Sequence, residues 1–238
     1  MTGIDPTSPR CVISFDTSLQ GLSCGVMCPE ENTSYKIVRP MARGQSEDLI
    51  PYIQRVLNFA GKTFQDIDFV ITTRGPGAFT GLRIGLAAAK ALKTALDCHV
   101  YGVCSLDALA HQVRLNMQAE GKNYHRLWII LETKRKDFYV RGFDSDGMAF
   151  NDPAVVSGDA LVSLVGEDDI IAGDGIARFQ KDHPGINVFV LHGYNLADPA
   201  ALWRAAQISA DDLSLDPIYL RGADVSSPKK KGRRLVSE

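Results

Sequence analysis

Residues 73–92 read TRGPGAFTGLRIGLAAAKAL, and this stretch decides how the surrounding chain is interpreted. Gly75–Gly77 predicts a tight turn directly after a buried strand. A helix over residues 79–96 follows, and the free N–H groups of its first turn would favour an anion. The stretch is not a Walker A loop, because no Gly-Lys-Ser/Thr follows, and it is not a GxGxxG motif, because Gly81 comes one position late.

Small residues recur every four positions along this helix and form one stripe, which consists of Gly77, Gly81, Gly85 and Ala89. A glycine inside a soluble helix costs about 1 kcal/mol relative to alanine, so the stripe indicates that another backbone comes very close. Polar residues fit within an arc of about 140°, which leaves more apolar surface than the ~100° needed to cover one sheet. Two interpretations follow: a second face of the helix packs on a partner helix, or the glycine-rich helix packs inside its own lobe.

The strands and helices expected on either side of this stretch indicate one folding unit that occurs twice in the chain. Residues 11–118 are expected to fold in the order βββαβαβα, and residues 126–208 are expected to repeat that order. The first helix, near residues 49–60, has apolar positions at intervals of three and four, with Ser46 as its expected N-cap.

A duplicated unit of this order is the plan of the actin, Hsp70 and sugar-kinase superfamily. We therefore expect an α/β protein of two tandem RNase H-like lobes, each a mixed sheet flanked by helices. The expected organisation is a loose lead at 1–10, an N-terminal lobe at 11–109 with a C-terminal return at 212–225, a smaller second lobe at 110–211, and a basic, disordered tail at 226–238. In enzymes of this superfamily each half ends its first strand at an acidic residue beside the nucleotide, and Asp16 and Glu132 occupy those two places.

The composition is that of a globular chain, with 45% hydrophobic and 23% charged residues among 238. A net charge of −2 does not indicate a general affinity for nucleic acid. No apolar run approaches the ~18 residues of a membrane span, and residues 1–10 do not resemble a secretory signal. The cysteines are expected to be buried free thiols in a reducing cytoplasm, and the histidine spacing predicts no metal site.

Several segments resemble the TsaB family. Residues 74–85, Arg-Gly-Pro-Gly-Ala-Phe-Thr-Gly-Leu-Arg-Ile-Gly, resemble its signature, and four further segments agree in order: Ile13–Ser18, Ser46–Pro51, Tyr101–Leu109 and Pro217–Arg221. These segments cover most of residues 11–109 and the C-terminal element. The chain departs from the family at Gln45, where histidine is frequent, and at residues 132–139, where the family usually has Asp-Ala-Arg followed by Glu-Val-Tyr.

The resemblance implies a subunit without an active site of its own, in the complex that forms N6-threonylcarbamoyladenosine next to the anticodon of tRNA. In that family TsaB pairs through its two N-terminal helices with TsaD, which carries the metal and nucleotide, or alone with a second TsaB as a homodimer. The small ATPase TsaE joins the complex, and tRNA is reached through the complex. No metal and no tightly bound cofactor are therefore expected, and ATP or ADP would bind only at the complex interface.

The resemblance also implies contact residues in place of catalytic ones. The expected partner interface consists of Leu49, Ile53, Val56, Leu57, Gly81, Arg83, Gly85 and Ala89; core packing is the alternative for the first four. A vestigial nucleotide cleft is expected from Asp16, Thr17, Glu132, Gly173 and Asp174, with a plain turn as the alternative for Asp174. The basic tail, with Lys229, Lys230, Lys231, Arg233 and Arg234, either contacts tRNA phosphates or is a solvated end.

Two other classes of protein remain as alternatives. A small-molecule kinase or ATPase of the same fold is favoured by Asp16, Glu132 and the turn at Gly173–Gly175, but the chain is short and lacks the phosphate-loop glycine. A peptidase would need a nucleophile beside a base, or a metal, and the sequence offers neither.

Overall fold

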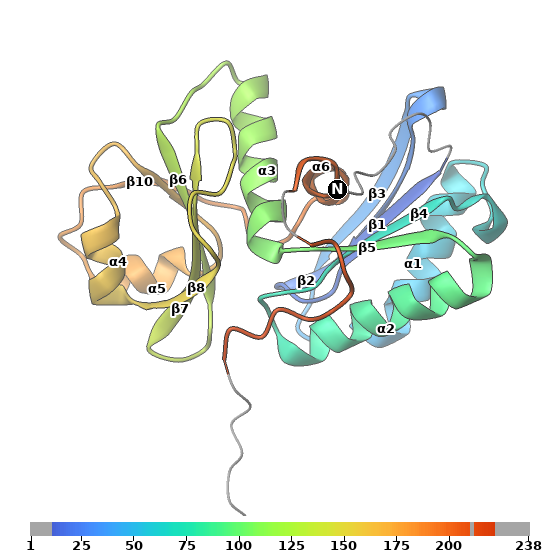
Figure 1. Cartoon of the computed structure of the whole chain (residues 1–238), viewed down its shortest axis with the longest axis horizontal. Helices are drawn as coiled ribbons and strands as arrows, with labels where there is room; N and C mark the ends of the chain where they lie inside the picture. Colours follow the sequence, from blue (N-terminus) through green and yellow to red (C-terminus); the bar gives the residue numbers. More distant parts are fainter. Residues whose placement is uncertain (1–10, 210–211, 222–238) are drawn as a thin grey trace, which may run out of the picture.

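The computed structural model describes residues 11–209 and 212–221, and its two mixed sheets have the same strand order (Figure 1). The first sheet is ordered β3-β2-β1-β4-β5, with β1 Val12–Asp16, β2 Gly21–Cys28, β3 Thr33–Pro40, β4 Phe69–Thr73 and β5 His99–Val103. The second is ordered β8-β7-β6-β9-β10, with β6 Arg126–Glu132, β7 Asp137–Asp144, β8 Ala154–Ser157, β9 Ile170–Ala172 and β10 Phe189–Leu191. In each sheet the first three strands are antiparallel and the last two run parallel to the first. The predicted duplicated α/β fold is confirmed.

The six α-helices in the described part of the chain form three pairs, which alternate with the two sheets. Helices α1 Gln45–Phe59 and α2 Phe79–Leu96 cover the outer face of the first sheet. Helices α4 Gly158–Leu164 and α5 Ile176–Asp182 cover the outer face of the second. Helices α3 Ser105–Ala119 and α6 Pro199–Ile208 lie between the two sheets and share one apolar core with both.

Each of the two inner helices packs on the sheet of the other half of the chain, so the expected lobe boundary does not separate them. Helix α6, which the sequence assigned to the second lobe, packs on the first sheet, where the Ser14 hydroxyl donates to the Pro199 carbonyl at 2.7 Å. Helix α3, the last helix of the first unit, packs on β6 and β7. The boundary expected after residue 109 falls inside α3 and is wrong, because each inner helix buries its apolar residues against strands from the other half of the chain.

Residues 212–221 follow the first lobe, as the expected C-terminal return does, although they form no strand. The Gly102 N–H donates to the Leu213 carbonyl at 2.9 Å, and the Ile218 N–H donates to the Arg74 carbonyl at 2.7 Å. At the end of this segment Arg221 forms an ion pair with Asp137 of the second lobe. The expected lead at 1–10 and tail at 226–238, with its lysines and arginines, lie outside the described residues.

Burial of the five cysteines agrees with the sequence-based expectation. All five are free thiols that are buried in the protein. Burial raises the pKa of Cys11 and of Cys104 to about 12, so these thiols stay protonated and unreactive at neutral pH. None of the helices within residues 11–209 has the length and hydropathy of a membrane span.

The start of α1 differs from its prediction. The helix begins at Gln45, and its N-cap is Gly44, whose φ of +102° is in a region that L side chains rarely adopt. Ser46, the expected cap, therefore lies in the first turn, where its hydroxyl donates to the Glu47 carboxylate at 2.7 Å.

Candidate functional site

A cleft of about 1050 Å³ opens between the two lobes. Its first-lobe wall is the turn after β1 together with the N-terminal ends of α1 and α2, and its second-lobe wall is the end of β6 with Tyr139 and Asp174. Neither N-terminus has a side-chain cap, because Gly44 and Ala78 are the N-cap residues. The cleft lies where the superfamily pattern predicts a nucleotide.

Asp16 lies at the end of β1, but it closes a turn instead of facing the cleft. Its carboxylate accepts from the Ser18 N–H at 3.0 Å and from the Ser18 hydroxyl at 2.7 Å. It also accepts from the Leu19 N–H at 3.2 Å and from the Thr73 hydroxyl. Asp16 is fully buried, so these groups of its own lobe occupy both of its oxygens.

Thr17, the next residue, does line the cleft. Its hydroxyl donates to the Gly81 carbonyl in α2 at 2.7 Å. Thr17 therefore links the turn after β1 to α2, and its hydroxyl proton is used in this contact within the protein.

Glu132 ends β6 at the position equivalent to Asp16. Its carboxylate is also bonded to a group of the protein itself. Its two carboxylate oxygens accept from the Arg178 guanidinium at 2.8 and 3.1 Å. Bidentate pairing of this kind holds both oxygens in one geometry. The sequence did not indicate Arg178 as a site residue, because it lies 46 positions from Glu132.

Asp174 connects the two lobes, which is more than the plain turn considered from the sequence. One carboxylate oxygen accepts from the Glu132 N–H at 2.8 Å, and the other accepts from the Gln20 side-chain amide at 3.0 Å. Burial raises the pKa of Asp174. The preceding Gly173 has φ of +117°, and a Cβ there would lie 2.2 Å from the Ile130 carbonyl oxygen, so its role is structural.

The glycine stripe of α2 faces its own lobe. A Cβ at Gly81 would lie 2.0 Å from the Thr17 carbonyl oxygen, and one at Gly85 would lie 2.9 Å from the Thr17 hydroxyl. The close backbone inferred from the stripe is therefore the β1 turn. Gly81, Gly85 and Ala89 are buried within the monomer, and their assignment to a partner interface is wrong.

Four further residues of the expected interface also belong to the core. Leu49, Ile53, Val56 and Leu57 are at most 1% exposed and pack between α1 and the first sheet. Of the eight expected interface residues only Arg83 is exposed, with its guanidinium 3.9 Å from the ring centroid of Phe79. The alternative of core packing is correct for these four leucine, isoleucine and valine side chains, because the same helix face cannot cover both a sheet and a partner.

A different set of apolar side chains is exposed on the outward surface of α1 and α2. We name this surface the outer face; it comprises Ile50, Phe79, Ala87 and Ala91. Phe59, nine positions after Ile50, lies on the opposite side of α1, where its ring packs against Tyr35 of β3 with 5.9 Å between the ring centroids. The side chain of Phe79 is about half exposed, at 51%. The sequence signal for this set was the apolar arc on α2 that exceeds the width needed for one sheet.

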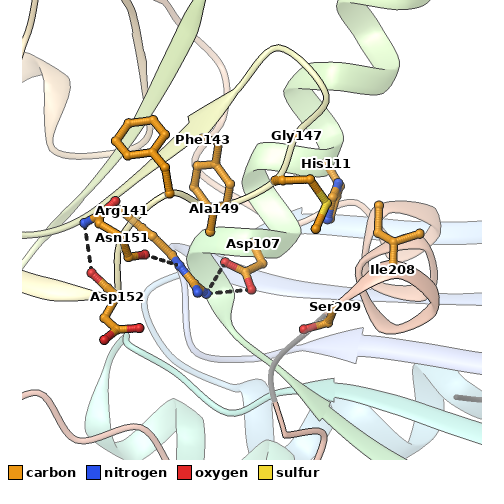
Figure 2. Close-up of a pocket in the computed structure, with 12 residues that line it drawn as sticks. Asp107, His111, Arg141, Phe143, Gly147, Ala149, Asn151, Asp152, Ile208 and Ser209 are labelled. Carbon is orange, nitrogen blue, oxygen red and sulfur yellow. Dashed lines mark hydrogen bonds and ion pairs between the residues drawn. The ribbon is translucent and has the colours of Figure 1, made fainter. Parts of the chain in front are cut away.

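A second cavity, of about 420 Å³, lies on the inner side of the second sheet and is lined by α3, β7, the loop after β7 and the end of α6 (Figure 2). The Asp107 carboxylate accepts from the Arg141 guanidinium at 2.7 and 2.8 Å, and both side chains are buried. The Arg141 Nε also donates to the Asn151 carbonyl at 3.0 Å. These contacts tie α3 to β7 across the inner core.

His111, one turn along α3 from Asp107, lines the same cavity. It is 4% exposed, and within the described residues its Nδ1 has no hydrogen-bond partner. Burial, with a smaller contribution from Arg114, lowers the pKa of His111 to about 4. The imidazole is therefore neutral at neutral pH.

Acidification is expected to destabilise the fold through His111. Because the pKa is near 4 when folded and near 6.5 when unfolded, the unfolded state binds more protons between these pH values. The free energy of unfolding should therefore fall as pH drops from about 6.5 to 4, by about 3 kcal/mol for this group. Urea unfolding of wild type and His111→Gln across this window measures the effect. An identical pH dependence in the two proteins would show that His111 titrates normally.

Residues 11–209 and 212–221 contain no cluster of three or more His, Cys, Asp or Glu side chains that could hold a metal ion. The acidic residues that favoured a kinase or ATPase, Asp16 and Glu132, are both bonded to groups of the protein itself. The chemistry open to the cleft is therefore anion binding, by N–H groups of the α1 and α2 first turns together with Arg43 and Lys134 on its rim.

Comparison with known proteins identifies the family. A family model described as TsaD, tRNA N6-adenosine threonylcarbamoyltransferase, matches residues 37–162, more than half of the chain. An uncharacterised protein of Mycobacterium tuberculosis is 28% identical over 90% of this chain and 92% of its own length. The tRNA threonylcarbamoyladenosine biosynthesis protein TsaB of Haemophilus influenzae is 24% identical over 93% of this chain and 98% of its own length.

A solved structure has the same fold. It is an uncharacterised protein with similarity to peptidase YeaZ from Pseudomonas aeruginosa, with a TM-score of 0.75 and 21% identity over 89% of this chain and all of that one. Two observations thus agree: the sequence matches extend over nearly the whole chain, and the signature at residues 74–85 forms the turn and glycine-lined start of α2. The chain belongs to the TsaB family, within the wider family that the TsaD model describes.

Proposed function

We propose that this chain is a non-catalytic subunit of the bacterial complex that forms N6-threonylcarbamoyladenosine next to the anticodon of tRNA. The pathway follows from its membership of a family whose named relatives are tRNA threonylcarbamoyladenosine biosynthesis proteins. The observation that carries the non-catalytic role is the internal bonding of the two acids that end β1 and β6, Asp16 to its own turn and Glu132 to Arg178. A carboxylate held in this way is not available to bind a metal or to accept a proton from substrate.

The proposed role is to bind and activate the catalytic subunit TsaD through the outer face. This surface lies on the two N-terminal helices, and Arg83 at its edge lies over the ring of Phe79. Exposed aromatic side chains flanked by arginine are typical of protein interfaces. In the absence of TsaD the same surface would pair two copies of this chain.

The proposal includes no tightly bound cofactor. ATP or ADP would bind only where the cleft meets the partner, because the cleft offers N–H groups and the cations Arg43 and Lys134 to phosphates but no free pair of carboxylates to a metal. TsaE would join this assembly as the ATPase, and the cytoplasm is the expected site of the reaction. Stoichiometric ATP binding by the isolated chain in equilibrium dialysis would favour the kinase or ATPase alternative instead.

Depletion of the chain in its bacterial host tests this function. We expect the modified nucleoside to disappear from digested tRNA when the chain is depleted, and to return when wild-type protein is supplied. Mass spectrometry of the digested tRNA measures the amount of the modified nucleoside. Unchanged nucleoside in depleted cells would contradict the proposed role.

One further part of this proposal concerns the basic tail. The basic residues Lys229, Lys230, Lys231, Arg233 and Arg234 lie outside the described residues, so their contact with tRNA phosphates stays a prediction. Comparison of tRNA affinity for complexes with and without residues 228–238 would test it.

A further inference from the structure

The hairpin that joins β6 to β7 carries three consecutive exposed cations. We call residues 133–137, Thr-Lys-Arg-Lys-Asp, the basic hairpin. Lys134, Arg135 and Lys136 are all exposed, and Lys134 with Thr133 lines the rim of the cleft between the lobes. The chain as a whole has a net charge of −2, so this local concentration of positive charge is not a general property of its surface.

Hydrogen bonds within the basic hairpin fix its shape. The Thr133 hydroxyl donates to the Asp137 carbonyl at 2.6 Å and accepts from the Arg135 N–H at 3.2 Å. Lys134 adopts φ of +59°, a left-handed conformation that costs a lysine roughly 1–2 kcal/mol. The turn therefore holds Lys134 in an unfavourable backbone geometry at the rim, with Arg135 and Lys136 directly after it in the hairpin.

The acidic residues next to Lys134 and Lys136 are already paired with arginines. Glu132 is paired with Arg178 at 2.8 Å, and Asp137 is paired with Arg221. Each acid on the hairpin thus has an arginine partner from elsewhere in the chain. Within the described ranges neither Lys134 nor Lys136 forms an ion pair, so these two ammonium groups are available to an anion.

An arginine side chain also lies on the opposite rim of the cleft. Arg43, directly before the start of α1, is exposed and lines the same cleft from the first lobe. Phe79 of the outer face lines the cleft as well, so the cationic rim is continuous with the surface proposed to bind the catalytic subunit. A polyanion bound to the catalytic subunit would therefore contact the cations at the rim of the cleft.

We propose that the basic hairpin, together with Arg43, binds the phosphate backbone of tRNA in the assembled complex. This inference rests on the proposed function, since it assumes that the chain sits beside the tRNA-modifying subunit. Lysine and arginine contacts to phosphate position a nucleic acid without reading its sequence. The hairpin would therefore add affinity for tRNA, and would place the RNA, without selecting the modified base.

The test measures tRNA affinity of the reconstituted complex of this chain with TsaD by fluorescence anisotropy between 50 and 200 mM salt. The hairpin variant carries Lys134→Ala, Arg135→Ala and Lys136→Ala. The control variant carries Lys122→Ala, Lys181→Ala and Arg204→Ala, which removes the same number and kind of exposed cations elsewhere. We expect the hairpin variant to bind about tenfold more weakly at low salt, and its slope of log K against log salt to be smaller by about 2–3.

Each outcome decides a separate part of the proposal. Equal affinity and salt slope in the hairpin and control complexes, both intact by mass, would overturn the RNA contact while leaving the proposed function standing. Unchanged tRNA affinity with weakened binding of TsaE would instead assign the hairpin to a protein contact. If the wild-type chain neither joins TsaD nor supports modification, the proposed function itself fails, and the hairpin proposal fails with it.

Discussion

Gly81→Ala is expected to destabilise the isolated monomer by about 3 kcal/mol, an unusually large effect for the addition of one methyl group. The new Cβ would lie 2.0 Å from the Thr17 carbonyl oxygen and 2.8 Å from the Thr17 carbonyl carbon. Those atoms are backbone, and the turn that carries them is fixed by the Asp16 carboxylate, so they cannot move aside cheaply. Urea unfolding followed by circular dichroism measures the loss.

A control on the same helix separates this effect from helix propensity. Ala87→Leu adds a larger side chain at an exposed position of α2 and should change stability by no more than about 0.5 kcal/mol. Gly85→Ala should fall between the two, because its Cβ would meet the hydroxyls of Thr17 and Thr72 and no backbone atoms. A Gly81→Ala monomer of wild-type stability that no longer pairs with TsaD would restore the glycine stripe as a partner interface.

Charge placed on the outer face is expected to abolish pairing while the monomer stays folded. Ile50→Asp combined with Phe79→Asp puts two carboxylates on exposed apolar positions of α1 and α2. Buried aromatic anchors at interfaces contribute 2 kcal/mol or more each, so the affinity for TsaD should fall at least about 100-fold. Analytical ultracentrifugation of the mixture, together with the melting temperature of the isolated variant, measures both properties.

Phe189→Asp provides the matched control for that variant. Phe189 is the most exposed large apolar side chain of the described residues, at 73%, and lies on β10 of the second lobe, away from the outer face. The Phe189→Asp variant should pair with TsaD as the wild-type chain does. Equal loss of pairing in both variants would mean that the interface does not lie on α1 and α2.

The order of elements could be predicted from sequence because strand and helix periods are local properties. The βββαβαβα order recurs in both sheets as expected. The packing of each inner helix on the sheet of the other half could not be predicted, because the apolar face of a helix does not by itself specify which sheet it covers. Which sheet each helix covers depends on contacts such as Ser14 to Pro199, which join residues 185 positions apart.

The candidate site was predictable in position but not in chemistry. Asp16 and Glu132 end equivalent strands, so their places beside the cleft follow from the repeated pattern. Asp16 accepts hydrogen bonds from Ser18 and Leu19 of its own turn. The other partners, Thr73 of Asp16 and Arg178 of Glu132, are remote in sequence, and only the folded chain shows them. In the same way, the glycine stripe revealed that a backbone approaches α2 without revealing that it is the Thr17 turn.

Reconstitution with one component left out tests the central claim most directly. Purified TsaD, TsaE and the adenylate-forming enzyme would be supplied with tRNA, threonine, bicarbonate and ATP, with and without this chain. We predict that threonylcarbamoyladenosine forms only when the chain is present, and that the outer-face variant fails to replace it. Equal modification without the chain would contradict its role as an activating subunit.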